Sequence, residues 1–338
     1  MTDTNFSTLA EKPELYKETL QLIEKSFSYS DENSFEMDFA PLVHEENHEN
    51  CHLFIKNDKV IGHIGIRKVS FGDKNSTFPL IMMGGICICE KERGKGYFKT
   101  FFEHVYNQYK EKTGLFALWS NKEDFYAKFG FHQAGGQIIV ESNGNPTGPT
   151  EGPFRFSELG MEDISLMMMI YEDFAADKWT IQRDMGDWEV LKNIDSCQIH
   201  FIPSRLEPHG YIISNKGQDL QDVSHEIVFY EGLYEQYKSH LSTKQAWIPE
   251  GLTEGDPSLY TAFFKVGDHQ QFAQMIYTLT GDQVAISNIN NESVVFGFNG
   301  DSYEATHEEF LRYIFGPGPL AEFKGLLKPV VISGLDSI

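Results

Sequence analysis

Cysteine is scarce in this sequence, and long hydrophobic runs are missing. The 338 residues include four cysteines, which lack the paired Cys-x-x-Cys spacing of a zinc ribbon. We expect Cys51, Cys87, Cys89 and Cys197 to be reduced core or strand residues. No segment approaches the about 20 consecutive apolar residues of a membrane span, and residues 1–10 do not resemble a signal peptide. These absences indicate a cytoplasmic protein without a membrane partner.

Positive charge is also in short supply. The chain has 28 Lys and Arg against 50 Asp and Glu, a formal net charge of −22 at pH 7, and the acidic residues are spread along the sequence. Such a chain repels nucleic acids and anionic membranes, and it attracts small cationic molecules at long range. A polyanionic ligand would therefore need a strong local binding device.

The rest of the composition is typical of a folded globular protein. Hydrophobic residues make up 41% of the chain, which excludes a disordered protein, and the length fits two domains or three small ones. Residues 143–153 are rich in turn formers and lack apolar periodicity, which is typical of an exposed linker. This linker separates an expected domain at residues 1–142 from the later part of the chain.

Hydrophobic periodicity predicts an α/β fold with a mixed sheet in residues 1–142. An amphipathic helix is predicted by the helical spacing of Phe98, Phe101, Phe102, Val105, Tyr106 and Tyr109. Further helices are expected at residues 13–26 and 122–129. Strands are expected at residues 53–56, 60–69, 80–89, 115–119 and 137–140.

After the linker the periodic signals are weaker. Helices are expected at residues 161–176, 188–192, 233–241, 268–279 and 306–315. Strands are expected at residues 198–202, 211–214, 226–230, 259–266, 284–289 and 294–298. The tail at residues 328–338 is apolar, so we expect it to dock onto the protein.

A glycine-containing corner joins the strand at residues 80–89 to the phenylalanine-rich helix. Gly94 and Gly96 allow the backbone to approach a ligand, and the free N–H groups at the start of a helix form a phosphate seat. A Walker A loop is excluded because Cys89 stands where its first glycine is needed and no Ser or Thr follows Lys95. A dinucleotide fingerprint is excluded because Lys99 stands at its sixth place.

The corner resembles the Gln/Arg-x-x-Gly-x-Gly/Ala motif of the GNAT family of acyl-CoA-dependent N-acetyltransferases. Arg93 and Gly96 match its first and fourth places, whereas Phe98 departs at the sixth, where the Eis-type branch of the family tolerates a larger residue. A second match follows at residues 125–131, which resemble the Phe-Tyr-x-x-Phe-Gly-Phe core that carries the family's catalytic tyrosine. Two motifs in the family's order make the resemblance specific for residues 1–140.

The resemblance implies an enzyme that moves an acetyl group from acetyl-CoA to an amine, with no metal. We expect a primary amine of a small cationic molecule. The sequence does not choose among aminoglycoside-like polyamines, other small amines, peptide N-termini and lysine side chains. The backbone of Ile86, Cys87 and Ile88 would pair with the pantetheine arm. The diphosphate would lie on the N–H groups of Arg93, Gly94, Lys95, Gly96, Tyr97 and Phe98. Ser120 and Asn121 are further expected cofactor contacts. Tyr126 would act as general acid on the departing sulfur, and the terminal carboxylate of Ile338 as general base.

The Eis-type comparison also implies two further units. A degenerate GNAT-like unit is expected at residues 154–250, which we expect not to bind CoA because residues 231–234 lack the arginine and the second glycine of the motif. A small α/β unit similar to a sterol-carrier-like domain is expected at residues 251–338. The sequence does not determine the oligomeric state, and a homo-oligomer is one possibility.

Two functions of other classes compete with this interpretation. A non-catalytic acyl-CoA-binding or sensor protein would bind the cofactor without turnover, and Tyr126→Phe would leave its function intact. A zinc hydrolase is suggested by His-Glu-Glu-Asn-His at residues 44–48. That stretch follows Pro41, stays polar and enters a strand, so we expect a solvated loop and not a metal-binding helix.

Several residues have a plain structural alternative. Tyr126 could be a core ring, and Ile338 could be an end packed for stability. Glu36 and Asp38 could bind an ammonium group, although solvated surface carboxylates are the simpler interpretation. Trp119 is expected in the sheet core. A domain contact or a packed amphipathic helix would equally explain Trp179, Arg183 and Trp188.

Overall fold

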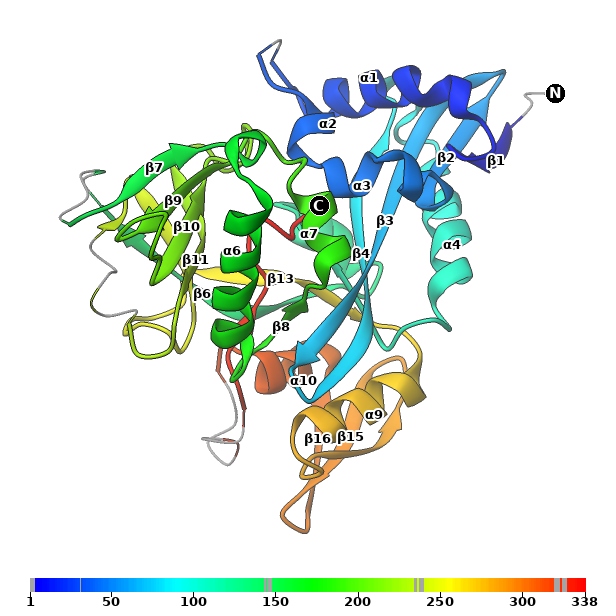
Figure 1. The fold of residues 1–338 in the computed structure, drawn as a ribbon. Coiled ribbons are helices and arrows are strands. Elements are labelled where there is room, and N and C mark those ends of the chain that lie inside the picture. Colours follow the sequence, from blue (N-terminus) through cyan, green and yellow to red (C-terminus); the bar gives the residue numbers. More distant parts are fainter. Residues whose placement is uncertain are drawn as a thin grey trace.

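The computed structural model describes residues 4–30, 32–142, 144, 148–233, 236, 240–318, 323 and 327–338. In these residues the chain forms a mixed α/β fold, with a 14-stranded sheet and a separate three-stranded sheet. Figure 1 shows the N-terminal residues, in blue and cyan, beside the green residues that follow the expected linker, with the orange residues below. No helix within the described ranges is both long and apolar enough to cross a membrane.

The elements of the N-terminal part agree largely with the expected pattern. The strands are β1 (Thr4–Thr8), β2 (Cys51–Lys56), β3 (Lys59–Asp73), β4 (Ser76–Ile88), β5 (Leu115–Leu118) and β6 (His132–Glu141). The helices are α1 (Tyr16–Ser26), α2 (Phe35–Asp38), α3 (Ala40–Val43), α4 (Tyr97–Tyr109) and α5 (Glu123–Ala127). Helix α4 buries Phe101, Phe102, Val105 and Tyr109, as its apolar spacing predicts.

The later elements extend the same sheet and build the second one. The strands are β7 (Glu151–Phe154), β8 (Trp179–Gln182), β9 (Gln198–Ile202), β10 (Gly210–Ser214), β11 (Val223–Phe229), β12 (Gln245–Pro249), β13 (Leu259–Val266), β14 (Ala285–Ile289), β15 (Ser293–Phe298), β16 (Asp301–Thr306) and β17 (Val330–Val331). The helices are α6 (Met161–Ala175), α7 (Met185–Leu191), α9 (His269–Leu279) and α10 (His307–Phe315).

Two expectations for this later part need comment. The expected linker does not continue to residue 153, because β7 begins at Glu151 and pairs with β9. An alternation of Glu, Gly and Pro hides this strand from a search for apolar periodicity. Most of the helix expected at residues 233–241 lies outside the described residues, and so do residues 143 and 145–147 of the linker.

The strand order of the large sheet is β1-β2-β3-β4-β5-β13-β6-β12-β11-β10-β9-β7, and β8 pairs with both β3 and β17. Strand β13 comes from the expected last unit, yet it lies between β5 and β6 and is antiparallel to both. The late part of the chain therefore completes the sheet that the N-terminal residues begin. The division into units at residues 142, 153 and 250 stays a proposal.

Strands β4 and β5 move apart after a short paired stretch, and the candidate site lies in the opening between them. The two strands pair in parallel only where Leu80–Met82 face Leu115–Ala117. Beyond that point β4 still pairs with β3, but residues 83–88 have no strand partner on the other edge in the described part of the chain. Gly85, at φ +57°, accepts a hydrogen bond from His63 Nδ1 at 2.8 Å. The result is a free strand edge beside an opening.

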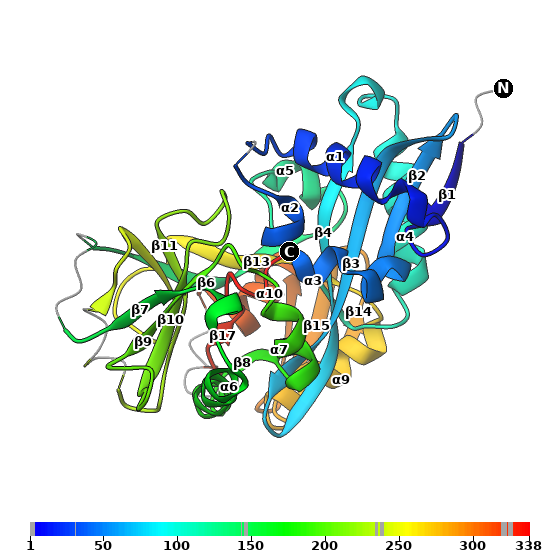
Figure 2. The same ribbon diagram turned by 45° about the horizontal axis from the view of Figure 1, so that its top comes forward.

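The chain ends in the middle of the molecule. Strand β17 pairs in parallel with β8, and the residues after it run between the N-terminal part and the green residues (Figures 1 and 2). Val330, Val331, Ile332 and Leu335 are buried. The expected docking of the apolar tail is confirmed.

Candidate active site

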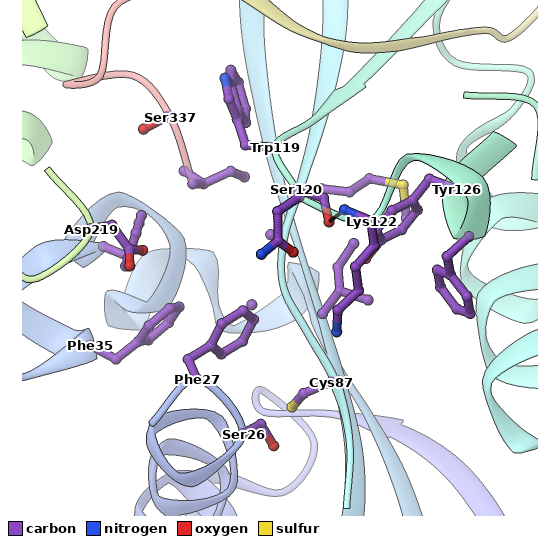
Figure 3. Close-up of a pocket in the computed structure, with 18 of the residues that line it drawn as sticks. Ser26, Phe27, Phe35, Cys87, Trp119, Ser120, Lys122, Tyr126, Asp219 and Ser337 are labelled. Carbon is purple, nitrogen blue, oxygen red and sulfur yellow. Dashed lines mark hydrogen bonds between the residues drawn. The ribbon is translucent and has the colours of Figure 1, made fainter. Parts of the chain in front are cut away.

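A cavity of about 1080 Å³ opens where β4 leaves β5. Its walls come from the end of α1, from α2, β4, the glycine corner, α5, β13 and the tail. Figure 3 shows Tyr126 on one side of the cavity and Phe35 and Asp219 on the other, with Trp119 and Ser120 between them. The cavity therefore joins residues of the N-terminal part to residues from far along the chain.

The glycine corner forms one end of the cavity. Gly94 and Gly96 have φ values of +75° and +80°, which glycine adopts without strain, and a Cβ at either position would meet no atom within 4 Å. Gly96 is the N-cap of α4, so the first N–H groups of the helix lack intrahelical partners. Open space, free N–H groups and the positive end of the helix dipole suit an anionic group.

Side chains around the corner fix its shape. Arg93 Nε donates to Ile88 O at 3.0 Å and ties the loop to the end of β4. Glu92 forms ion pairs with Lys56 at 2.8 Å and with Lys95 at 3.0 Å, so its negative charge is balanced beside the expected diphosphate. Lys95 itself does not line the cavity.

Phe98, which departs from the family motif, packs onto the helix that carries Tyr126. Its ring centroid lies 4.8 Å from that of Phe125 and 5.1 Å from that of Phe129, in edge-on contacts. A glycine or alanine would leave this space empty. The large residue thus links the first turn of α4 to α5.

Tyr126 projects from α5 toward the cavity, with 7% of its surface exposed. Burial raises its pKa, and the nearby Cys87 thiol adds to the shift. Its hydroxyl has no hydrogen-bond partner among the residues described. A phenol in this setting keeps its proton at neutral pH and can donate it to a ligand.

The terminal carboxylate of Ile338 lies against β4. A Cβ built on Gly84 would lie 2.5 Å from the carboxyl carbon of Ile338 and 2.8 Å from its oxygen, so only glycine leaves room for the chain end. Ile338 is 8% exposed and lines the same cavity as Tyr126. The carboxylate therefore sits on the strand segment where β4 has left β5.

Buried charged residues hold the tail in this position. Arg183 pairs with Glu226 at 2.5 Å and with Asp336 at 2.7 Å, and Arg67 donates to Asp336 O at 3.1 Å. Ser333 Oγ donates to Glu226 at 2.5 Å. The nearby positive charge of Arg183 lowers the pKa of Glu226 despite burial, which keeps the network charged. Arg183 therefore joins β11 to the tail.

The end of the cavity near the tail is aromatic and acidic. Rings of Phe27, Tyr29, Phe35, Phe39, Trp119, Trp247 and Tyr260 line the cavity. Asp219 contributes a carboxylate, and burial together with the nearby Asp38 raises its pKa. With Ile338, Asp219 brings negative charge to a largely apolar region.

The cavity brings together nearly all residues that the sequence analysis assigned to a site. The lining includes Ile86, Cys87, Ile88, Arg93, Gly94, Gly96, Tyr97, Phe98, Ser120, Asn121, Tyr126 and Ile338. Lys95 is the expected cofactor contact that lies outside the lining. No local motif in the sequence marks Gly84, Lys216, Asp219, Trp247 and Tyr260, and only the fold brings them to the cavity.

Other expectations had mixed outcomes. Asp38 is not a solvated carboxylate but is 1% exposed, while Glu36 is exposed and accepts a hydrogen bond from Tyr16 OH at 2.7 Å. Neither lines the cavity. Trp119 is not a sheet-core residue: it is half-buried beyond the end of β5, and its Nε1 donates to Thr261 O at 2.8 Å.

The cysteines are not paired, and residues 44–48 do not form a metal-binding helix. All four cysteines are free, and Cys51, Cys87 and Cys197 are buried, as expected. Residues 44–48 do not form the long helix of a zinc site, because Glu45–Asn50 form a 3-10 helix. Within the described residues, no three His, Cys, Asp or Glu side chains are arranged to hold a metal ion.

Comparison with known families agrees with the geometry. Residues 10–134 match the model of the acetyltransferase (GNAT) domain. This part of the chain is similar to the GNAT acetyltransferase domain. No curated protein matches its sequence.

Solved structures resemble this chain beyond the GNAT domain. A probable N-acyltransferase from Enterococcus faecalis shares 11% identity at a TM-score of 0.57, with 90% of this chain and 86% of that chain covered. A GCN5-related N-acetyltransferase from Anabaena variabilis shares 15% identity at a TM-score of 0.56, with 91% of this chain and 89% of that chain covered. Eis1 from Mycobacterium abscessus shares 11% identity at a TM-score of 0.56, with 90% of this chain and 85% of that chain covered.

These likenesses confirm the predicted mixed-sheet GNAT fold. At such low identity the structures show the fold alone, whereas the GNAT model supports acyl transfer as the general class of activity. The degenerate GNAT-like unit and the sterol-carrier-like unit stay predictions.

Proposed function

We propose that this protein is an N-acetyltransferase that moves an acetyl group from acetyl-CoA to a primary amine of a small cationic molecule. The observation that carries the proposal is the shared cavity: Tyr126, the carboxylate of Ile338 and the glycine corner all face it. A proton donor, a proton acceptor and an anion seat around one cavity are what such a transfer needs.

The fit to acetyl-CoA rests on the free edge of β4 and the open corner. Backbone groups of Ile86, Cys87 and Ile88 would pair with the pantetheine arm as an added strand. The N–H groups of residues 93–98 would hold the diphosphate, with Ser120 and Asn121 as further contacts. One charge at an exposed helix end is worth about 0.3–1 kcal/mol, so several converging N–H bonds must supply most of the binding.

The chain's own residues would then manage two protons. Bound acetyl-CoA supplies a thioester carbonyl, which the neutral amine attacks, forming the C–N bond and breaking the C–S bond. Tyr126 would give its hydroxyl proton to the departing sulfur, and the carboxylate of Ile338 would take a proton from the nitrogen. Return of that proton to the tyrosine oxygen through solvent restores both groups.

The lining at the acceptor end supports a cationic, partly apolar amine. Asp219 and Ile338 provide two negative charges against the one positive charge of Lys216, whose ammonium is already bound by the tail carbonyls. The surrounding rings offer faces that attract an ammonium group. The net charge of −22 favours the encounter with a cation.

Thiol release from acetyl-CoA against a panel of amines tests the proposal. For Tyr126→Phe we expect kcat to fall about 100-fold, the lower end of what general acid catalysis supplies, with an unchanged Kd for acetyl-CoA. Stability should change little, because the hydroxyl makes no hydrogen bond in the described residues. Unchanged turnover in the variant would exclude Tyr126 as the acid. Acetyl-CoA binding without turnover by the wild type would favour the sensor protein instead.

A further inference from the structure

The last turn of the chain converges on one ammonium group. Lys216, in the loop after β10, donates from Nζ to Gly334 O at 2.8 Å and to Ser337 O at 2.5 Å. Leu335 O and Ser337 Oγ lie farther away, at 3.5 and 3.4 Å. Lys216 is 2% exposed, and a buried ammonium group is costly without such partners. The tail carbonyls therefore stabilise the buried ammonium group, and the ammonium group fixes the position of the tail.

The contacts of Lys216 differ from those of the other tail anchors. Arg183 and Arg67 bind the tail through Asp336, and Arg183 also reaches Ser333. Within the described residues, Lys216 is the side chain that binds the carbonyl next to Ile338. It also lines the cavity, whereas both arginines lie outside the lining. A shift of this contact would move the carboxylate away from Gly84.

The surroundings make the charge of Lys216 sensitive to pH. Its ammonium lies 4.6 Å from the ring centroid of Phe39. The titratable and charged groups that act on it are Asp38 of α2, Arg67 of β3, Cys197 before β9, Asp219 of its own loop, His225 of β11 and Asp336 of the tail. Burial lowers the pKa of Lys216 to about 8.

We propose that Lys216 is a positioning residue whose ammonium group holds the last turn, so that the carboxylate of Ile338 stays beside Gly84 in the cavity. The effect on catalysis rests on the proposed function, in which that carboxylate takes the proton of the amine. Loss of the ammonium should lower kcat and leave the binding of acetyl-CoA unchanged.

The first test measures the hold on the chain end without relying on activity. Carboxypeptidase release of Ile338 from the full chain is followed by mass spectrometry. For Lys216→Met we expect release about tenfold faster or more, since two hydrogen bonds to a charged group are lost. Lys328→Met is the matched control, because Lys328 pairs with Asp73 at 2.6 Å at the start of the tail and does not line the cavity. Release from the control should equal that from the wild type.

A pH series covers the case in which Lys216→Met does not fold. In the wild type, release of Ile338 should accelerate between pH 7 and pH 9 after correction for the protease's own pH dependence, because the ammonium loses its charge there. Lys216→Arg keeps a charge and donors, and it should retain slow release at pH 9. A wild-type rate that does not change up to pH 11, above the ordinary lysine pKa of 10.5, would overturn the proposal.

The second test asks whether Lys216 acts through the carboxylate. With a responsive amine, Lys216→Met should lower kcat about tenfold or more and change the KM for acetyl-CoA less than twofold. In a chain lacking Ile338, the same substitution should lower kcat no further, since coupled residues are not additive. Multiplicative losses, or wild-type kcat in Lys216→Met, contradict the proposal. If no amine supports turnover in the wild type, the proposed function fails, and the carboxypeptidase result still decides the role of Lys216.

Discussion

Gly84 marks the point where the end of the chain meets the central strand. Its φ is not in the left-handed region, so backbone conformation does not require glycine there. Glycine is required there by lack of space, because a Cβ would lie 2.5 Å from the carboxyl carbon of Ile338. Gly65, its partner across β3 and β4, is different, because a Cβ there would meet the side chain of Leu42 at 2.7 Å. Gly84 therefore leaves space for the end of the tail, whereas Gly65 leaves space for a core side chain.

Gly84→Ala should displace the carboxylate of Ile338. We expect kcat to fall about 10- to 100-fold through loss of the general base, with a small change in the KM for acetyl-CoA. Gly65→Ala should lower the free energy of unfolding by about 1–3 kcal/mol through overpacking and leave kcat unchanged. Steady-state kinetics and urea unfolding of both variants measure this difference. Wild-type kcat in Gly84→Ala would show that the terminal carboxylate is not the base.

At the scale of elements, the corner before α4 and the short helix α5 act as one assembly. The left-handed glycines expose the N–H groups of the first turn of α4, and Phe98 in that turn packs on Phe125 of α5 and on Phe129 just after it. The proposed seat for the diphosphate is thereby linked mechanically to the helix that carries Tyr126. This packing explains why a large aromatic residue occupies the sixth place of the motif.

Gly96→Ala should weaken acetyl-CoA binding. Because a Cβ at Gly96 meets open space, the substitution strains only the backbone, at a cost of about 1–2 kcal/mol. Gly281→Ala is a matched control, since Gly281 has φ +63°, also faces open space and lies away from the cavity. We expect similar losses of stability in both variants, and a Kd for acetyl-CoA raised about tenfold only in Gly96→Ala. Calorimetric titration measures the Kd, and equal affinities would exclude the corner as the diphosphate seat.

At the scale of the whole molecule, buried histidines couple folding to pH. Burial lowers the pKa of His63 to about 4 and that of His52 and His225 to about 3. Between these values and the ordinary value of 6.5, the unfolded chain binds more protons than the folded one. The free energy of unfolding should therefore decrease as the pH falls below about 6.5.

His225→Leu isolates one of these groups. Neither ring nitrogen of His225 has a hydrogen-bond partner in the described residues, so leucine leaves no buried partner unsatisfied. The decrease in unfolding free energy between pH 6 and pH 4 should be smaller in the variant, by about 1 kcal/mol per pH unit. Urea unfolding at several pH values measures it. Parallel curves for variant and wild type would mean that His225 titrates alike in both states.

The sequence by itself determined the α/β class, the amphipathic helix α4 and the glycine corner that lines the cavity. These features are local, because a strand, a glycine corner and a helix within about forty residues carry their own periodicity and turn chemistry. The acceptor side was decided only by the tertiary structure. Gly84, the loop that carries Lys216 and Asp219, and the tail are far apart in the chain, and nothing in residue spacing records which buried charges will meet. Only the insertion of β13 into the sheet and the docking of the tail bring them together, since packing and charge pairing depend on distance in space.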